Sequence, residues 1–172
     1  TIAADGIPGV LRRRLQARFG NRGPGFLPLQ VDTRWVYRPG IRRETEGDWE
    51  VWNLTQGRAP HSRYGLGGSP TRLKGAGELV IHLDESIGRG VSSGSLHVQM
   101  QPSGGTLSFG PVGGPQKQVN TASESVRDLH ISLLSQGDFD AVKIESMGDG
   151  PLSFYGLSLE TDSRGLTWET LG

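Results

Sequence analysis

The sequence predicts a mainly β protein, an antiparallel β-sandwich or jelly roll of about eight strands with one N-terminal α-helix. From about Gln30 onward, apolar and polar residues alternate with the period of two that is typical of half-buried strands. Clusters rich in Gly and Pro separate these stretches, and the 172 residues include Gly 27 and Pro 10, enough for many turns. Helical periodicity is confined to the start of the chain, so we expect one principal β domain.

The predicted helix is defined by apolar residues that recur at helical spacing: Ile7, Val10, Leu11, Leu15 and Phe19. Asp5 can cap its start, Pro8 is tolerated in its first turn, and Gly20 suits the left-handed residue that ends a helix. Since an isolated helix of this length is marginal in water, its apolar side needs a cover. We expect either the β domain or another part of a parent protein to supply it.

Eight stretches carry strand-like patterns, at 49–54, 62–68, 78–84, 95–101, 106–110, 128–134, 140–146 and 152–160. Strands at this spacing, each with one polar face, favour an antiparallel sandwich over a parallel α/β sheet. Within 152–160 the apolar phase changes at Gly156, which predicts a β-bulge there. The stretch 123–136 also fits a helical face, but its alternation favours a strand.

Composition argues against several classes of partner and cofactor. The formal net charge is +0 and the sequence pI about 6.9, so no global field attracts nucleic acid or an anionic membrane. There is no Cys, and no segment is long and apolar enough for a membrane span. We therefore predict no nucleic-acid partner, no membrane span and no cofactor.

No catalytic or metal-binding motif stands out. His82 and Asp84 could share a strand face, but two ligands without a third make a poor metal site, and we predict none. The serines lack the context of an activated nucleophile, and GLGGSP at 65–70 lacks the lysine and helix of a phosphate loop. His97 and His130 occupy polar positions of predicted strands, where solvent exposure is the simplest interpretation. We assign no catalytic residue to this chain.

An aromatic cluster in the first half of the chain is the candidate binding site: Trp35, Tyr37, Trp49, Trp52 and Tyr64. Several arginines are interspersed with it, and aromatic faces beside hydrogen-bonding groups suit sugar rings. These rings are the predicted substrate-binding residues. The alternative is that some of them belong to the core and others cover a junction with a neighbouring domain.

From Asp5-Gly6 to Phe26 at its start and from Tyr155 onward at its end, the chain resembles a known family, the SGNH (GDSL-type) hydrolases of the bacterial carbohydrate-esterase-like branch. The matching features at the start are Asp5-Gly6, the helix with Leu11, Arg12, Leu15 and Gln16, then Phe19-Gly20 and Gly23 to Phe26. The final stretch YGLSLETDSRGLTWETLG is similar to the last strand of a galactose-binding-like jelly roll followed by re-entry into the hydrolase sheet. Between the ends, GDWEVWNLT and SRYGLGGSP resemble the β domain inserted in that branch.

The resemblance implies three segments: 1–29 as helix and loop of the hydrolase fold, 30–162 as a jelly-roll β-sandwich, and 163–172 as a strand returning to the hydrolase fold. The family's nucleophile, oxyanion and His/Asp blocks match no position here, and we expect them outside this chain. The parent protein would then be a serine esterase or acetyltransferase, periplasmic or extracellular, whose other hydrolase segments are partners of this chain.

The predicted function is therefore that of a non-catalytic β-sandwich domain of an SGNH-type esterase, helping to position an acetylated polysaccharide or peptidoglycan. One alternative is an architectural or protein-interaction module without a sugar site. Another is an active serine esterase whose catalytic blocks lie outside this chain.

Overall fold

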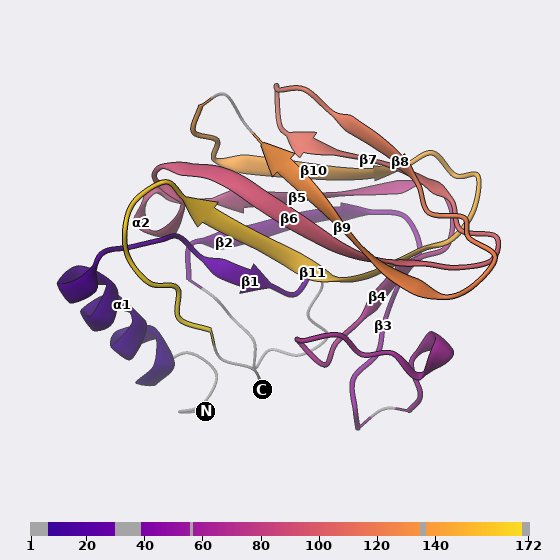
Figure 1. Ribbon diagram of the computed structural model, residues 1–172, viewed down its shortest axis with the longest axis horizontal. Coiled ribbons are helices and arrows are strands. Elements are labelled where there is room, and N and C mark those ends of the chain that lie inside the picture. The colour runs from indigo at the N-terminus through magenta and orange to yellow at the C-terminus, as the bar shows by residue number, and fades with distance from the viewer. Residues whose placement is uncertain (1–6, 30–38, 56, 135–136, 170–172) are drawn as a thin grey trace.

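Two antiparallel sheets stacked face to face form the body of the protein (Figure 1). The computed structural model describes residues 7–29, 39–55, 57–134 and 137–169. The front sheet has the strand order β3-β4-β11-β6-β9, with β1 also paired to β11. The back sheet has the order β2-β5-β10-β7-β8. All these pairings are antiparallel, which confirms the predicted sandwich.

The front sheet consists of β1 (Gly25–Leu27), β3 (Trp49–Val51), β4 (Thr71–Leu73), β6 (Val91–Met100), β9 (Arg127–Leu134) and β11 (Leu152–Thr161). The back sheet consists of β2 (Ile41–Glu46), β5 (Gly77–Leu83), β7 (Thr106–Pro111), β8 (Lys117–Asn120) and β10 (Ala141–Ser146). Three helical segments accompany them: α1 (Ile7–Phe19), the single turn α2 (Glu85–Gly88) and the 3₁₀ turn η1 (Pro60–Ser62).

The core lies between the sheets and follows the alternation of the sequence. Leu79, Ile81 and Leu83 of β5 point inward and are at most 5% exposed. Phe109 of the back sheet and Phe154 of the front sheet are the largest fully buried side chains. Successive strand residues point to opposite faces, so the neighbours of these inward residues, such as Glu78 and His82, lie on the outer face.

The predicted bulge is confirmed in β11. The register of β11 against β6 shifts between Phe154 and Gly156, so Leu157 returns to the core after Tyr155 has pointed outward. A Cβ at Gly156 would lie 2.3 Å from Cζ of Phe26 and 2.8 Å from the carbonyl oxygen of Leu27. The missing side chain at this position therefore lets β1 lie against the bulge.

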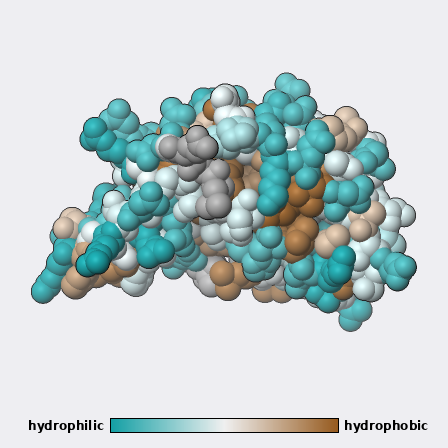
Figure 2. Space-filling model, turned by 45° about the horizontal axis from the view of Figure 1, so that its top comes forward, coloured by the Kyte–Doolittle hydropathy of each residue, from teal (hydrophilic) through white to brown (hydrophobic). Residues whose placement is uncertain are grey.

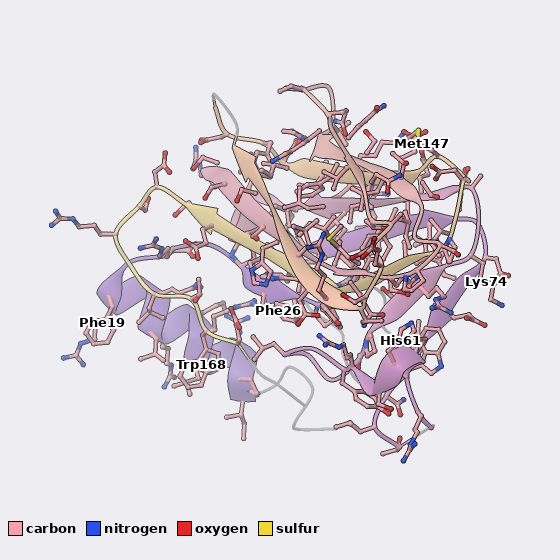
Figure 3. All side chains as sticks on the ribbon, turned by 45° about the vertical axis from the view of Figure 1, so that its right-hand side comes forward. Phe19, Phe26, His61, Lys74, Met147 and Trp168 are labelled. Carbon is pink, nitrogen blue, oxygen red and sulfur yellow. The ribbon has the colours of Figure 1, made fainter. Side chains whose placement is uncertain are left out.

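Helix α1 ends as predicted, with Gly20 at a φ of 94°, but it presents an unexpected side to the sandwich. Its buried residues are Gly9 and Arg12, whereas Ile7 and Phe19 are 64% and 56% exposed. The helix extends from one side of the molecule, with Phe19 at its outer end (Figures 2 and 3). The described part of the β domain therefore does not cover the apolar side of this helix. The proposed cap Asp5 lies outside the described residues.

Most of the predicted strands are confirmed. They include β9 at 127–134, which lies in a stretch whose pattern also fitted a helix. The prediction of a strand over 62–68 is wrong, because this stretch follows η1 as turns in which Gly65 and Gly68 adopt positive φ values of 66° and 64°. Short strands without clear alternation, at β1, β2, β4 and β8, bring the total in the described chain to 11.

Replacing Gly156 with Ala is expected to lower the free energy of unfolding by about 2–3 kcal/mol, because the new methyl group overlaps Phe26 and the β1 backbone. Urea denaturation of the purified variant measures this. Gly75→Ala is the control, since a Cβ there meets nothing within 4 Å and should change stability by about 0.5 kcal/mol or less. Equal stability of the two variants would contradict the close packing at the bulge.

Candidate functional site

The outer face of the front sheet carries an unusual concentration of aromatic and ionisable side chains. They alternate with the core residues of three adjacent strands: His97 and Gln99 on β6, Asp128 and His130 on β9, and Ser153, Tyr155 and Ser158 on β11. The bulge at Gly156 sets the spacing between Tyr155 and Ser158. Neighbouring strands thus bring together residues that are up to 61 positions apart in the sequence.

The loop between β3 and β4 (residues 52–55 and 57–70, the β3–β4 loop) lies over part of this face. Gly65 lies so close to Tyr155 that a Cβ there would be 2.7 Å from Cβ of the tyrosine. Gly67 stands in the same relation to Phe26, where the distance to Cε1 would be 2.8 Å. In Figure 3, His61 marks this loop and Phe26 marks β1, both on the same side of the sandwich. Gly65 and Gly67 of GLGGSP therefore allow close packing of the loop on the sheet.

Between the loop and the sheet lies a groove with a volume of about 440 Å³, within the range of small-molecule sites. Its lining residues are Phe26, Arg63, Tyr64, Gly65, Leu66, His97, Asp128, His130, Tyr155 and Ser158. Its walls are mostly aromatic or aliphatic, and its polar groups come from a few side chains. This combination is typical of sites that bind a small organic ligand by its apolar faces and orient it by hydrogen bonds.

Asp128 connects the loop to the sheet. Its Oδ1 accepts hydrogen bonds from Nη1 of Arg63 and from the hydroxyl of Tyr155, both at 2.8 Å. The Tyr155 hydroxyl in turn accepts a hydrogen bond from Nε2 of Gln99 at 2.8 Å. The charge of Asp128 raises the pKa of Arg63, while burial, and secondarily Asp128, raises the pKa of Tyr155. Both groups therefore keep their protons at neutral pH and remain donors to Asp128.

Two imidazoles meet at the centre of the groove. The ring centroids of His97 and His130 are 4.6 Å apart in an edge-to-face arrangement, and Phe26 lies 5.8 Å from His97. Nε2 of His97 lies 2.9 Å from Oγ of Ser158. Burial lowers the pKa of His97, and His130 adds to this effect, while Glu169 opposes it. No group of three or more His, Asp or Glu side chains suited to a metal ion occurs among the described residues.

A second, much smaller hollow adjoins the groove and shares Arg63 and Tyr155 with it. Trp52 lines this hollow, and its ring lies 6.0 Å from the guanidinium carbon of Arg72 on the same face. The aromatic surface thus continues from the groove toward β4.

The structure separates the five predicted aromatic residues. Tyr64 lines the groove and Trp52 the adjoining hollow. Trp49 instead packs against the core, with its ring 5.9 Å from that of Phe154. Trp35 and Tyr37 lie outside the described residues.

Sequence reasoning missed most of the groove. His97 and His130 do lie on the outer face, but they are directly paired across β6 and β9 and line the groove. Asp128 is in register with Gln99, and Tyr155 of β11 completes the set. The alternation in the sequence indicated which residues of each strand face away from the core. Only the strand order shows that the outward residues of β11, β6 and β9 lie side by side.

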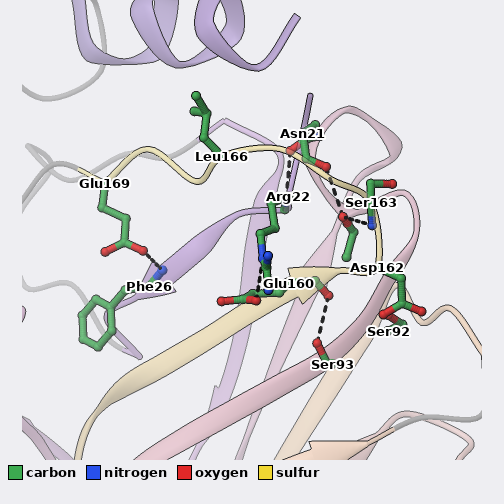
Figure 4. Close-up of polar contacts among 12 residues, drawn as sticks. Asn21, Arg22, Phe26, Ser92, Ser93, Glu160, Asp162, Ser163, Leu166 and Glu169 are labelled. Atoms are coloured by element: carbon green, nitrogen blue, oxygen red, sulfur yellow. Dashed lines mark hydrogen bonds and ion pairs between the residues drawn. The ribbon is translucent and has the colours of Figure 1, made fainter. Parts of the chain in front are cut away.

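The two terminal segments run together beside the groove (Figure 4). Asn21 and Leu166 form a parallel bridge, and Arg22 pairs with Glu160 at 2.9 Å. Oε1 of Glu169 accepts a hydrogen bond from the backbone N–H of Phe26 at 2.7 Å. The C-terminal segment therefore holds the strand that carries a groove residue.

Comparison with known proteins identifies the fold. The chain aligns with the solved structure of a peptidoglycan O-acetylesterase at a TM-score of 0.68 and 20% sequence identity, covering 99% of this chain and 43% of that one. It thus spans less than half the length of that protein. Weaker matches include a CBM35 from Cellvibrio japonicus (TM-score 0.43, 13% identity, 74% of this chain and 99% of the other). The C-terminal CBM6 of LamC from Zobellia galactanivorans matches with a TM-score of 0.43 and 7% identity, over 70% and 99% of the two chains.

No family model matches the sequence, and no curated protein does. The likeness to the acetylesterase structure is one of fold, a jelly-roll β-sandwich with its flanking segments. No helix among the described residues is long and apolar enough to cross a membrane.

Replacing Arg63 with Met removes the ion pair with Asp128 but keeps the aliphatic stem. Amide hydrogen exchange in residues 57–68 should accelerate, while the urea midpoint of global unfolding stays nearly unchanged, because this pair is exposed. Arg58→Met, on the same loop, is the matched control and should leave exchange unchanged. Unaltered exchange in the Arg63 variant would show that the ion pair does not hold the loop.

Stability should depend on the ionisation of His97. In the unfolded chain its pKa returns to about 6.5, above the folded value, so between the two values the unfolded state binds more protons. The free energy of unfolding should therefore fall as the pH drops below about 6.5, and His97→Gln should make this dependence shallower. Urea denaturation at several pH values measures the slopes. Gly75→Ala, which changes no ionisable group, is the control and should keep the wild-type slope; an unchanged slope in His97→Gln would refute the assignment.

Proposed function

We propose that this chain is the non-catalytic β-sandwich part of an SGNH-type esterase and that its groove helps to position an acetylated polysaccharide or peptidoglycan. The observation that carries the proposal is the groove itself, where Tyr64, Tyr155 and Phe26 offer ring surfaces beside Asp128 and the paired imidazoles. Sugar rings have apolar C–H faces and polar rims, which suit such walls. The fold shared with a peptidoglycan O-acetylesterase supports the same substrate class.

Trp52 and Tyr64 remain our candidates among the aromatic residues predicted to contact sugar. Tyr64 lies in the groove, and Trp52 would extend the contact surface along the same face toward β4. Trp35 and Tyr37 stay predictions. We assign Trp49 to packing against Phe154.

The proposed division of the chain is a hydrolase segment at 1–29, the sandwich at 30–162 and a returning segment at 163–172. The first of these segments also contributes β1 to the front sheet. Two contacts support this division: the bridge from Asn21 to Leu166, and the bonds that Nε2 of Gln16 donates to the carbonyl oxygens of Gly23 and Leu166, both at 3.2 Å. The exposed apolar residues Ile7 and Phe19 give α1 a side suited to packing against the other hydrolase segments, its proposed partners. We assign the catalytic groups to those segments and a periplasmic or extracellular location to the parent protein.

The exposed side of α1 also favours the second candidate function, an architectural or protein-interaction module. The two candidates differ in the groove, since only the first requires that a sugar bind there. An active esterase remains the third alternative, and turnover of p-nitrophenyl acetate by this chain above a heat-killed control would favour it.

Titration with acetylated and plain oligosaccharides, followed by NMR, tests the sugar-binding proposal. We expect millimolar ligand to shift the ring signals of His97 and His130, and His130→Ala to weaken binding about fivefold or more because an exposed groove wall is lost. The free energy of unfolding of this variant should change by about 0.5 kcal/mol or less.

His61→Asn is the control for that titration, because His61 is exposed on the β3–β4 loop and does not line the groove. It should bind as the wild-type chain does. Groove signals that stay unmoved at millimolar concentrations of every oligosaccharide would remove the sugar-binding function and leave the interaction module.

A further inference from the structure

The charges around the groove are not balanced. Among its lining residues, Arg63 is the permanent cation, and its guanidinium is already committed: Nη1 donates to Asp128 at 2.8 Å and Nη2 to the carbonyl oxygen of Val126 at 3.5 Å. This cation and the carboxylate of Asp128 cancel each other. A ligand anion would therefore find no unpaired positive charge among the described residues of the groove.

A further negative charge lies at the β1 end of the groove. The carboxylate of Glu169 is held there by the backbone N–H of Phe26 at 2.7 Å, and it is close enough to act on the charge of His97. Burial lowers the pKa of His97, so this imidazole adds no positive charge at neutral pH. The other titratable or charged groups that face it are His130 and Asp128 on β9, Tyr155 on β11, and Arg63 and Tyr64 on the loop.

Binding in this groove removes water from the ligand, because the walls are largely aromatic and aliphatic. Desolvating a carboxylate or phosphate is costly unless a partner of opposite charge replaces the water. Here Asp128 already neutralises Arg63, so that no positive charge is left for the ligand, and the further carboxylate of Glu169 would repel it. A neutral sugar ring meets neither penalty and can use the same carboxylates as acceptors for its hydroxyl groups.

We infer that the groove selects uncharged sugar units and rejects acidic ones, so that on a glycan with both kinds of unit it takes the neutral ring. This inference rests on the proposed sugar-binding function and specifies the class of sugar. It assigns to Asp128 and Glu169 a role in specificity through their charge.

The test compares two ligands that differ only at C6: N,N′-diacetylchitobiose, and its analogue in which both C6 hydroxymethyl groups are oxidised to carboxylates. At about pH 7.5 the neutral disaccharide should bind the wild-type chain about tenfold or more tightly than the dicarboxylate. NMR titration of the His97 and His130 ring signals gives both dissociation constants and shows that binding is in the groove.

Asp128→Asn and Glu169→Gln each remove one negative charge while keeping an oxygen that can accept the original hydrogen bonds. Each should strengthen binding of the dicarboxylate relative to the neutral disaccharide about threefold or more. Asp138→Asn, exposed beyond the far end of β9, is the matched control and should change neither affinity. Each variant tests one carboxylate separately. If one variant does not fold, the other still tests the inference.

Equal or tighter binding of the dicarboxylate by the wild-type chain would overturn the inference and leave the sugar-binding function intact. An unchanged ratio of the two affinities in the folded groove variants would overturn the role of Asp128 and Glu169. If neither disaccharide moves the histidine signals at millimolar concentration, the inference fails together with the proposed function.

Discussion

The contact between Phe26 and the bare backbone of Gly156 is the constraint on which the rest of the front sheet depends. With no side chain at Gly156, β1 can pair with β11 over Gly25–Leu27 and place the Phe26 ring against the bulge. The extra residue of the bulge also lets Tyr155 point outward while Phe154 and Leu157 both point into the core. Gly156 thus determines which residues of β11 face the core, and it positions Phe26 as one wall of the groove.

The groove depends on a second layer of packing, because a flat sheet face does not enclose a ligand. The β3–β4 loop supplies the other wall, and it lies close to the sheet through Gly65 on Tyr155 and Gly67 on Phe26. Arg63 adds an ion pair to Asp128, whose side chain is half exposed. Small residues set how near the loop lies, and the charged pair sets where along the strand it is held.

The sequence was sufficient for the architecture where its pattern was periodic. Alternation in β5 and β10 and the phase change at Gly156 reported burial directly, since burial on one face of a strand has a period of two. It failed over 62–68, where glycines adopt positive φ values and the chain turns. Strands as short as β1 and β4 are held by their neighbours, so their own residues carry little signal.

The site was less predictable than the fold for a related reason. Tyr64 and Trp52 were found because aromatic residues cluster locally in the sequence. His130 and His97 meet only because β9 and β6 are adjacent, and nothing in a single sequence gives that order. The sequence could not distinguish the roles of Trp49 and Trp52, which are three positions apart. Trp49 lies in β3 and pairs with β4, whereas Trp52 follows the end of that strand and lines the hollow.

The pairing of β1 with β11 has a consequence for the order of events in folding. Gly25 lies opposite Leu159, so the first and last strands of the sandwich are neighbours in one sheet. Closing a loop of that length has a high entropic cost, and it comes before the contact contributes any stability. During synthesis β1 therefore cannot form its pairing in the front sheet until β11, more than a hundred residues later in the chain, has left the ribosome.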